Sequence, residues 1–126
     1  MNAWVICWSE DQDTGYHDHD DSAAAVAVVS GRVREDRLLL WAPPRSQELG
    51  PGETFTVPAA AIDRVLHAAT EPAVTIHVYS PPLRRTGAYR VAAEGELLRE
   101  SLPTEATLAA QPAPLGASSR AQVAVS

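Results

Sequence analysis

Two histidines in the N-terminal part of the chain have the spacing of a pair of metal ligands. His17 and His19 stand two positions apart in the run Gly-Tyr-His-Asp-His-Asp-Asp at 15–21. Residues i and i+2 of a strand project to the same face, so both imidazoles would reach one ion. A solvated acidic loop that happens to contain two histidines explains the same pattern, and the spacing alone does not choose between these interpretations.

The same region is rich in aspartate, which raises the question of a calcium loop. An EF-hand loop requires a third ligand before its glycine and a glutamate six residues after that glycine. Gly15 occupies the place of the third ligand, so the order does not fit. We therefore expect no calcium site, although carboxylates crowd the segment at Asp11, Asp13, Asp18, Asp20 and Asp21.

The segments that must position these residues are predicted to be strands. Short runs of β-branched and aromatic residues alternate with turn signals, and no run holds a helical period over a window long enough to define a helix. This pattern predicts an all-β sandwich or barrel. The expected strands are Trp4–Trp8, Ala25–Val33, Leu38–Trp41, Thr54–Val57, Ile62–Leu66, Val74–Tyr79, Tyr89–Val91 and Glu96–Arg99, and the expected turns include Pro43-Pro44, Pro51-Gly52, Pro81-Pro82 and Glu94-Gly95.

Length and composition predict one folded domain. The chain has 126 residues, of which 45% are hydrophobic and 21% are charged. These values are close to the average of globular domains. Beyond Pro103 the sequence is poor in bulky apolar residues, so we expect a domain at 1–103 and a disordered tail at 104–126.

The net charge and the cysteine content limit the classes of binding partner and the cellular compartment that we expect for this protein. A net charge of −6 disfavours nucleic acid as a partner, and no apolar run is long enough to span a membrane. The single cysteine, Cys7, excludes an internal disulfide, so we expect a reducing cytoplasm. Because Cys7 lies in the apolar run at 4–8, we predict that it is buried in the core. The sequence leaves the oligomeric state open.

Longer motifs in the chain resemble those of the cupin superfamily. The first cupin motif, His-x-His followed by a glycine, is matched by His17, His19 and Gly31, with alanine at 23 and 24 where the motif usually has a glutamate. The second motif keeps its spacing but changes its last two residue types, at Gly52, Pro58, Asp63 and His67. This resemblance implies an all-β cupin fold, the double-stranded β-helix or jelly-roll barrel.

Within that superfamily the chain resembles the cysteine dioxygenase type of thiol dioxygenases. The resemblance is carried by Cys7-Trp8, Ser22, Val-Ser-Gly-Arg-Val-Arg-Glu at 29–35 and Thr-Ile-His-Val-Tyr-Ser-Pro-Pro-Leu at 75–83. It implies an Fe(II) cofactor, cysteine or a related small thiol and O₂ as substrates, and a sulfinate product.

The resemblance also implies catalytic residues in a second-sphere relay at Thr75, His77 and Tyr79. Alternate residues of a strand face one way, so the three side chains would lie together. Taken alone, His77 and Tyr79 would equally fit ordinary inward packing in a barrel.

The third metal ligand is the main departure from the family. Asp63 stands where the resemblance places a ligand histidine. Two histidines and one carboxylate are a common Fe(II) arrangement, so we expect Asp63 to complete the site with His17 and His19. His67 is the second candidate, but four residues of a strand separate it from Asp63 by roughly 13 Å. A carboxylate ligand lowers the positive charge of the site and predicts weaker affinity for an anionic thiol.

Two further departures concern the surroundings of the site. Ala24 stands where crosslinking members of the family carry a cysteine, so Tyr79 is expected to remain a free phenol. The family's N-terminal segment supplies an arginine for the substrate carboxylate ahead of Cys7, and we expect this clamp to be missing. The arginines after the prolines at 81–82 are interpreted as solvated surface charges, namely Arg84, Arg85 and Arg90.

Two hypotheses of function follow from these features. The first is an iron-dependent thiol dioxygenase, supported by the histidine pair and the run at 75–83. The second is a degenerate, non-catalytic cupin that binds metal or a small ligand, favoured by Asp63 in the ligand position.

Overall fold

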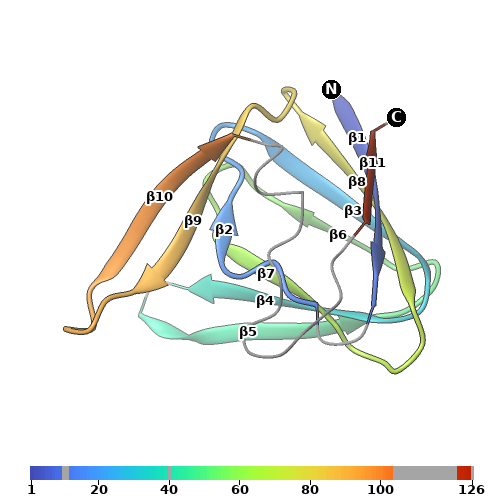
Figure 1. Ribbon diagram of the computed structural model, residues 1–126, viewed down its shortest axis with the longest axis horizontal. Coiled ribbons are helices and arrows are strands. Elements are labelled where there is room, and N and C mark those ends of the chain that lie inside the picture. Colours follow the sequence, from blue (N-terminus) through green and yellow to red (C-terminus); the bar gives the residue numbers. More distant parts are fainter. Residues whose placement is uncertain (10–11, 40, 104–121, 126) are drawn as a thin grey trace.

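The chain folds into two antiparallel sheets that face each other. The computed structural model describes residues 1–9, 12–39, 41–103 and 122–125 (Figure 1). One sheet has the strand order β11-β1-β8-β3-β6 and the other β10-β9-β2-β7-β4-β5. The strands are β1 (Asn2–Trp8), β2 (His17–Asp18), β3 (Ala23–Ser30), β4 (Val33–Leu39), β5 (Ala42–Leu49), β6 (Thr54–Val57), β7 (Asp63–His67), β8 (Ala73–Ser80), β9 (Arg85–Val91), β10 (Leu97–Pro103) and β11 (Gln122–Val125). The described residues contain no helix, which confirms the all-β prediction.

The core lies between the two sheets and follows the period of two expected for strands. In β1 the side chains of Trp4, Ile6 and Trp8 are buried, and in β3 those of Ala24, Val26 and Val28 are buried. Val33 and Val65 fill the core from the other sheet. Burial of these apolar side chains stabilises the sandwich. Buried polar residues also occupy a few inward positions of β4, β7 and β8.

The expected single strand Ala25–Val33 is in fact two strands. β3 ends at Ser30 and β4 begins at Val33, with Gly31 between them at φ +72°. A Cβ atom on Gly31 would lie 2.6 Å from the Cα of Ala73 and 2.6 Å from the carbonyl oxygen of Pro72. The chain therefore turns here because only glycine fits against the start of β8.

Replacing Gly31 with alanine is expected to lower the free energy of unfolding by about 2–3 kcal/mol, because left-handed strain and a backbone clash add together. Gly52 is the matched control, since it also has a positive φ but a Cβ there would meet no atom within 4 Å. Gly52→Ala is expected to cost only about 1 kcal/mol. Urea denaturation of both variants measures the difference, and equal losses would contradict the role given to the clash.

The expected strand Leu38–Trp41 is also wrong in its bounds. β4 ends at Leu39, and Trp41 lies in the hairpin turn with φ +65° and full exposure. Pro43 and Pro44, predicted to form a turn, belong to β5 instead. Among the described strands β5 pairs only with β4. A prolyl residue, which lacks an N–H, is tolerated on such an edge strand beside the irregularity in the β4–β5 register.

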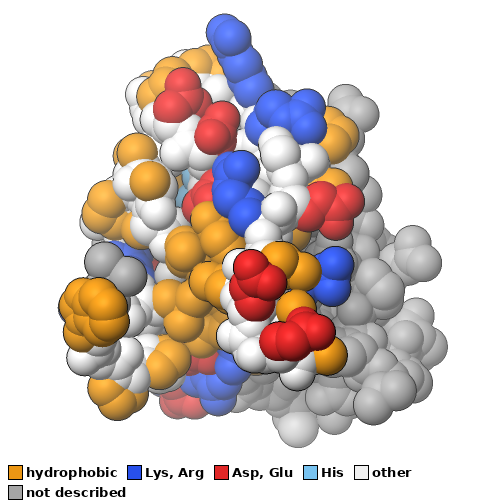
Figure 2. Space-filling model, turned by 90° about the vertical axis from the view of Figure 1, so that its left-hand side faces the viewer, with side chains coloured by type: hydrophobic (Ala, Val, Ile, Leu, Met, Phe, Trp, Pro, Cys, Tyr) orange, Lys and Arg blue, Asp and Glu red, His pale blue; other side chains and the backbone are white. Residues whose placement is uncertain are grey.

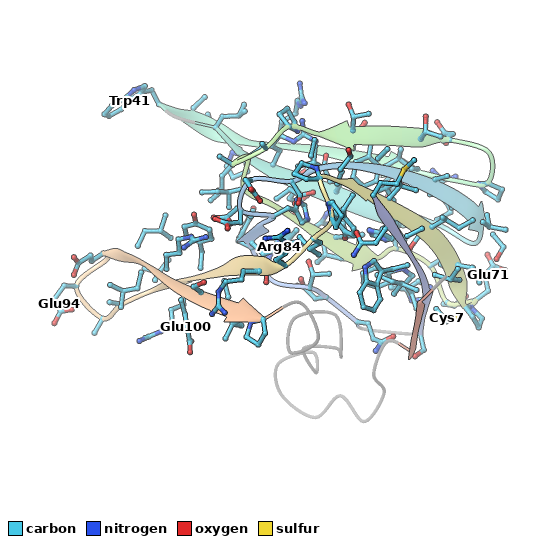
Figure 3. All side chains as sticks on the ribbon, turned by 90° about the horizontal axis from the view of Figure 1, so that it is seen from above. Cys7, Trp41, Glu71, Arg84, Glu94 and Glu100 are labelled. Carbon is cyan, nitrogen blue, oxygen red and sulfur yellow. The ribbon has the colours of Figure 1, made fainter. Side chains whose placement is uncertain are left out.

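Two hairpin tips point to one side of the molecule. Trp41 marks the tip of the β4–β5 hairpin and Glu94 the tip of the β9–β10 hairpin (Figure 3). The face in Figure 2 shows acidic and basic side chains around a band of apolar ones. Exposed apolar residues near these tips include Leu39, Val91 and Leu97.

The prediction that Cys7 is buried is wrong. Trp4, Ile6 and Trp8 face inward, so the alternation of the strand directs Cys7 to the outside, where it is exposed. Apolar neighbours in the sequence did not decide its burial, because residues i and i+1 of a strand lie on opposite faces.

The first and the last described strands, β1 and β11, lie side by side (Figure 1). The expected disordered tail at 104–126 falls mostly outside the described residues. Within that segment, Gln122–Val125 form β11 and pair antiparallel with β1. Main-chain groups of β1 that would otherwise form a free sheet edge are paired in this way. The described part of the chain has no helix that is long and apolar enough to cross a membrane.

Candidate metal centre and polar relay

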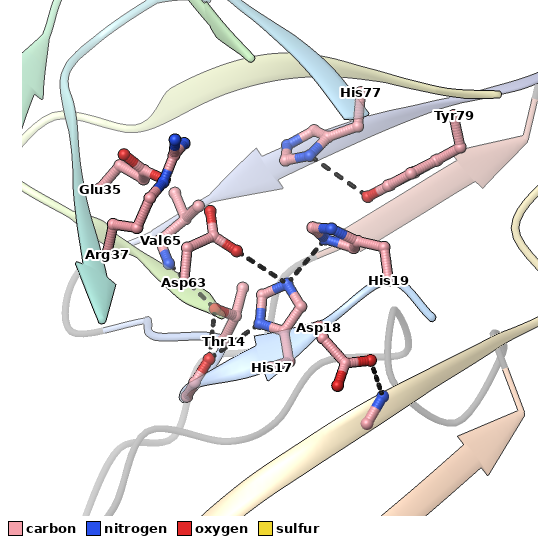
Figure 4. Close-up of polar contacts among 12 residues, drawn as sticks. Thr14, His17, Asp18, His19, Glu35, Arg37, Asp63, Val65, His77 and Tyr79 are labelled. Carbon is pink, nitrogen blue, oxygen red and sulfur yellow. Dashed lines mark hydrogen bonds and ion pairs between the residues drawn. The ribbon is translucent and has the colours of Figure 1, made fainter. Parts of the chain in front are cut away.

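Three buried side chains from two adjacent strands converge inside the sandwich. His17 is the Cα partner of Asp63 where β2 pairs with β7, and His19 follows β2 directly. The two Nε2 atoms of His17 and His19 are 3.1 Å apart, and Nε2 of His17 is 3.8 Å from Oδ1 of Asp63 (Figure 4). The candidate ligand atoms of all three residues lie within 4.8 Å of one another.

The donor set fits a divalent metal ion. The carbonyl oxygen of Gly15 accepts a hydrogen bond from Nδ1 of His17 at 2.9 Å, which leaves the lone pair of Nε2 directed into the cluster. Oδ1 of Asp63 is buried and has no hydrogen-bond partner among the described residues. Two imidazoles and an unpaired carboxylate oxygen that face one another are the ligands of a two-histidine, one-carboxylate site.

Burial keeps both histidines in the neutral form that binds metals. Desolvation lowers the pKa of His17, and it lowers the pKa of His19 to about 3. Repulsion between protonated imidazoles, from His17 and His77, would further disfavour a charge on His19. Neutral imidazole supplies a nitrogen lone pair near neutral pH, so no proton competes with a metal ion at these two residues.

A second layer of polar residues, which was not predicted from the sequence, lies behind Asp63. Glu35 and Arg37 face the sandwich interior from β4, where Arg37 is the Cα partner of Asp63. Nη2 of Arg37 donates to Oε2 of Glu35 at 2.8 Å, and Nε2 of Gln47 donates to Oε1 of Glu35 at 3.0 Å. Glu35 was part of the run at 29–35, and alternation along β4 could have placed it on the inward face with Val33, but its position beside Asp63 depends on the pairing of β4 with β7.

Asp63 holds a proton when no metal is bound. Burial raises its pKa to about 9, and the neighbouring carboxylate of Glu35 adds to this effect through a hydrogen bond and through charge. Arg37 opposes the shift but is paired with Glu35. Release of this proton must accompany metal binding, because the carboxylate is the form that coordinates.

The metal-free protein is expected to lose stability as the pH rises from about 6.5 to about 9. In this range folded Asp63 keeps a proton that the unfolded chain has released, so the free energy of unfolding falls by at most about 1.4 kcal/mol per pH unit. Below pH 6.5 the lowered pKa values of His17, His19 and His77 act in the opposite direction, so the range above it isolates Asp63.

Denaturation by urea in the presence of a chelator measures this slope. Asp63→Asn is expected to flatten it, because asparagine does not titrate. His67→Ala on the same strand is the control and should keep the wild-type slope. An unchanged slope in Asp63→Asn would show that another group carries the pH dependence.

The relay residues lie next to the metal centre. Thr75, His77 and Tyr79 are buried on one face of β8. Oγ1 of Thr75 is 2.8 Å from Nε2 of His77, and Nδ1 of His77 is 3.5 Å from the hydroxyl oxygen of Tyr79. The rings of Tyr79 and His19 are tilted against each other with centroids 5.3 Å apart. A continuous polar row therefore runs from Thr75 to the edge of the metal cluster.

Burial also sets the protonation of this row. Desolvation lowers the pKa of His77 to about 3 and raises the pKa of Tyr79 above its usual range, so both groups are neutral near pH 7. Ala24 lies directly across from Tyr79 in the β3–β8 ladder, and the one cysteine of the chain is exposed on β1. The described residues therefore place no cysteine beside the ring of Tyr79.

His67 lies away from the metal cluster. It ends β7 opposite Val33, and its Nε2 is 2.5 Å from the carbonyl oxygen of Glu71. Arg84 and Arg90 are exposed, and Arg85 donates to Ser101 on β10. The structure therefore brings Asp63, and not His67 or these arginines, to the pair His17 and His19.

Asp18 anchors the short strand that carries the histidines. Its carboxylate points away from the metal cluster and accepts hydrogen bonds from Arg99, from the hydroxyl of Tyr89 and from the main-chain N–H of Gly87 (Figure 4). Burial would raise the pKa of Asp18, but the hydrogen bonds from Arg99 and Tyr89 outweigh it and hold the pKa well below its usual range. These contacts fix β2 to β9 and β10.

Comparison with solved structures confirms the cupin fold. The cupin domain of Drosophila melanogaster CENP-C matches with a TM-score of 0.59 at 11% identity, over 63% of this chain and 56% of that one. Lactobacillus farciminis oxalate decarboxylase, solved as a formate complex, matches with a TM-score of 0.59 at 15% identity, over 85% of this chain and 27% of that one. The all-β jelly-roll barrel implied by the motifs is therefore present.

Comparison of sequences identifies the family. Cysteine dioxygenase type 1 of Rattus norvegicus is 30% identical over 92 residues, and that of Homo sapiens is 28% identical over 92 residues, in both cases with 65% of this chain and 46% of the relative covered. The chain thus spans about half the length of the curated relatives that it matches. A family model described as cysteine dioxygenase type I matches residues 1–92. On this evidence the chain belongs to the cysteine dioxygenase type I family.

Proposed function

We propose that this protein is an Fe(II)-dependent thiol dioxygenase whose metal ligands are His17, His19 and Asp63. The observation that carries the proposal is the convergence of these three buried groups beside the relay of β8, in a chain of the cysteine dioxygenase type I family. Bound Fe(II) would supply the redox chemistry that joins O₂ to sulfur. The substrates are cysteine or a related small thiol and O₂, and the single cysteine is in keeping with a reducing cytoplasm.

The overall reaction requires no further reactant. A thiol RSH and one molecule of O₂ give the sulfinic acid RSO₂H, in which both oxygen atoms are bonded to sulfur. The sulfur is oxidised and the dioxygen is reduced, so electrons balance without a separate reductant. The protein has to hold the two substrates together and to stabilise the oxygen atoms while their charge changes.

Tyr79 is the side chain proposed to touch the reacting atoms. Its hydroxyl is protonated near neutral pH and its ring contacts His19, so it can donate a hydrogen bond to a substrate oxygen beside the metal centre. His77 and Thr75 hold this hydroxyl from behind. Tyr79→Phe removes the donor and keeps the ring, so it tests this contribution separately from metal binding.

The charge of the site argues for weak binding of anionic thiols. Asp63 contributes a negative charge that a third imidazole would not contribute. Arg37 is the Cα partner of Asp63, and its guanidinium is engaged by Glu35 and by the carbonyl oxygen of Thr56. Arg37 is therefore not available to hold a substrate carboxylate.

The decisive experiment is O₂ uptake by Fe(II)-loaded protein with L-cysteine, 3-mercaptopropionate and cysteamine, with bound iron and sulfinate quantified on the same samples. We expect one molecule of O₂ to be consumed for each sulfinate formed. We also expect a faster reaction with cysteamine, which has no carboxylate, than with the two thiols that carry one. Asp63→His is run beside the wild type as the charge-altered variant.

A second candidate function is a cupin that binds metal without turnover, and Asp63 beside Glu35 is the observation that favours it. Iron-loaded wild type that forms no sulfinate from any thiol, together with recovery of activity in Asp63→His, would identify Asp63 as an inactivating residue. The absence of sulfinate in both proteins with full iron occupancy would support the binding function alone.

A further inference from the structure

The indole of Trp8 extends the polar row on β8 by one group. Nε1 of Trp8 donates a hydrogen bond to Oγ1 of Thr75 at 2.8 Å, and both side chains are almost completely buried. An indole nitrogen is a donor and never an acceptor, so the direction of this hydrogen bond is fixed. Thr75 must accept from Trp8.

The direction of the first hydrogen bond determines the second. Thr75 has one hydroxyl hydrogen, and its other hydrogen-bond partner among the described residues is Nε2 of His77 at 2.8 Å. If Nε2 carried a hydrogen, the hydroxyl hydrogen of Thr75 would be buried without an acceptor. Thr75 therefore donates to Nε2, and the hydrogen of the neutral imidazole is on Nδ1.

The tautomer of His77 also determines the direction of its hydrogen bond with Tyr79. With a hydrogen on Nδ1, His77 donates to the hydroxyl oxygen of Tyr79. The hydroxyl hydrogen of Tyr79 then points away from His77, which leaves it for an acceptor on the side where the Tyr79 ring meets His19. In the Nε2–H tautomer of His77, Nδ1 would accept a hydrogen bond from the hydroxyl of Tyr79. That hydrogen would then point to His77 and not to the metal centre.

We propose that Trp8 is a positioning residue that fixes His77 in the Nδ1–H tautomer and thereby presents the hydroxyl hydrogen of Tyr79 to the metal centre. The part concerning the tautomer stands on the hydrogen bonds alone, and its consequence for catalysis rests on the proposed function. In this arrangement the indole nitrogen of Trp8 is hydrogen-bonded to Thr75, and it acts on His77 through that hydroxyl group.

The chain offers a matched control on the same strand. Trp4 is also buried and faces inward from β1, where it is the Cα partner of His77, but its Nε1 has no hydrogen-bond partner among the described residues. Trp4→Phe and Trp8→Phe therefore remove the same atoms from similar surroundings. Only Trp8→Phe removes a hydrogen bond from the row.

The test is the tautomer of His77 by long-range ¹H–¹⁵N correlation NMR on the metal-free and the Zn(II)-loaded protein. Wild type and Trp4→Phe should show hydrogen on Nδ1. Trp8→Phe should raise the ratio of the Nε2–H to the Nδ1–H form about fivefold, since one hydrogen bond no longer biases it. If Trp8→Phe does not fold, 3-benzothienylalanine at position 8 removes the N–H group and keeps the shape of the ring system.

Hydrogen on Nε2 of His77 in the wild type, or the same tautomer ratio in Trp8→Phe and Trp4→Phe, would overturn the proposal. In the thiol dioxygenase assay, Trp8→Phe is expected to lower kcat about tenfold with KM little changed. A tautomer shift in a protein that oxidises no thiol would support the role of Trp8 and count against the proposed function only.

Discussion

Replacing Asp63 with alanine is expected to reduce the affinity of the protein for a divalent metal at least about 100-fold. Removal of outer-shell partners of metal ligands already costs 10–100-fold in many sites, and Asp63 would supply a ligand atom directly. The loss should be visible with Zn(II) and Co(II), because the carboxylate contributes charge as well as a lone pair. Isothermal titration of the metal-free protein at pH 7.5 measures both affinities.

His67→Ala is the control for this prediction, since His67 lies on the same strand but contacts the carbonyl of Glu71. Its metal affinity should equal that of the wild type. Retained affinity in Asp63→Ala together with a loss in His67→Ala would reverse the assignment of the third ligand. Titration in buffers of different ionisation enthalpy adds a second check, because metal binding to the wild type should release the proton held by Asp63.

Asp18→Asn is expected to lower the free energy of unfolding by about 3 kcal/mol, although Asp18 touches no metal ligand atom. The carboxylate of Asp18 accepts from Arg99 at 2.9 and 3.0 Å and from two further groups on β9, and asparagine leaves several of these donors without a charged acceptor. The strand β2 has only two residues, so its attachment to β9 holds the histidines in place. Metal affinity should fall together with stability.

Asp20→Asn is the control that separates the loss of the hydrogen bonds to Asp18 from the simple removal of one negative charge. Asp20 is half exposed and lies 3.6 Å from the same guanidinium of Arg99. An exposed ion pair of this kind contributes little, so the variant should change stability by less than about 0.5 kcal/mol. Urea denaturation gives both values. Equal losses in the two variants would mean that net charge, and not the buried hydrogen bonds of Asp18, stabilises this region.

Gly87 shows why this anchor could not be read from the sequence. A Cβ atom at Gly87 would lie 2.2 Å from Nε of Arg99, so the absence of a side chain leaves the space in which the guanidinium reaches Asp18. Nothing in the spacing of Asp18, Gly87 and Arg99 along the chain indicates that they meet. Their contact depends on β9 pairing with both β2 and β10.

The sequence predicted the class of fold and the candidate ligands because both depend on local patterns. Period-two burial needs only the alternation of side chains along each strand, and this is why Trp4 to Trp8, Val74 to Tyr79 and the pair His17 and His19 were placed in strands or on one face. The same rule should have placed Cys7 outside, but the apolar run around it concealed the alternation. Motifs of the family then supplied the cupin topology.

The tertiary structure decided which groups meet across strands. Asp63 rather than His67 joins the histidine pair because the register of β2 on β7 pairs His17 with the first residue of β7, and register is set by the packing of the whole sheet. The same long-range pairing put Glu35 and Arg37 behind Asp63, and Trp8 behind Thr75. Local sequence specifies which face a side chain occupies, whereas its neighbours on that face come from strands distant in sequence, whose order is fixed only when the sandwich closes.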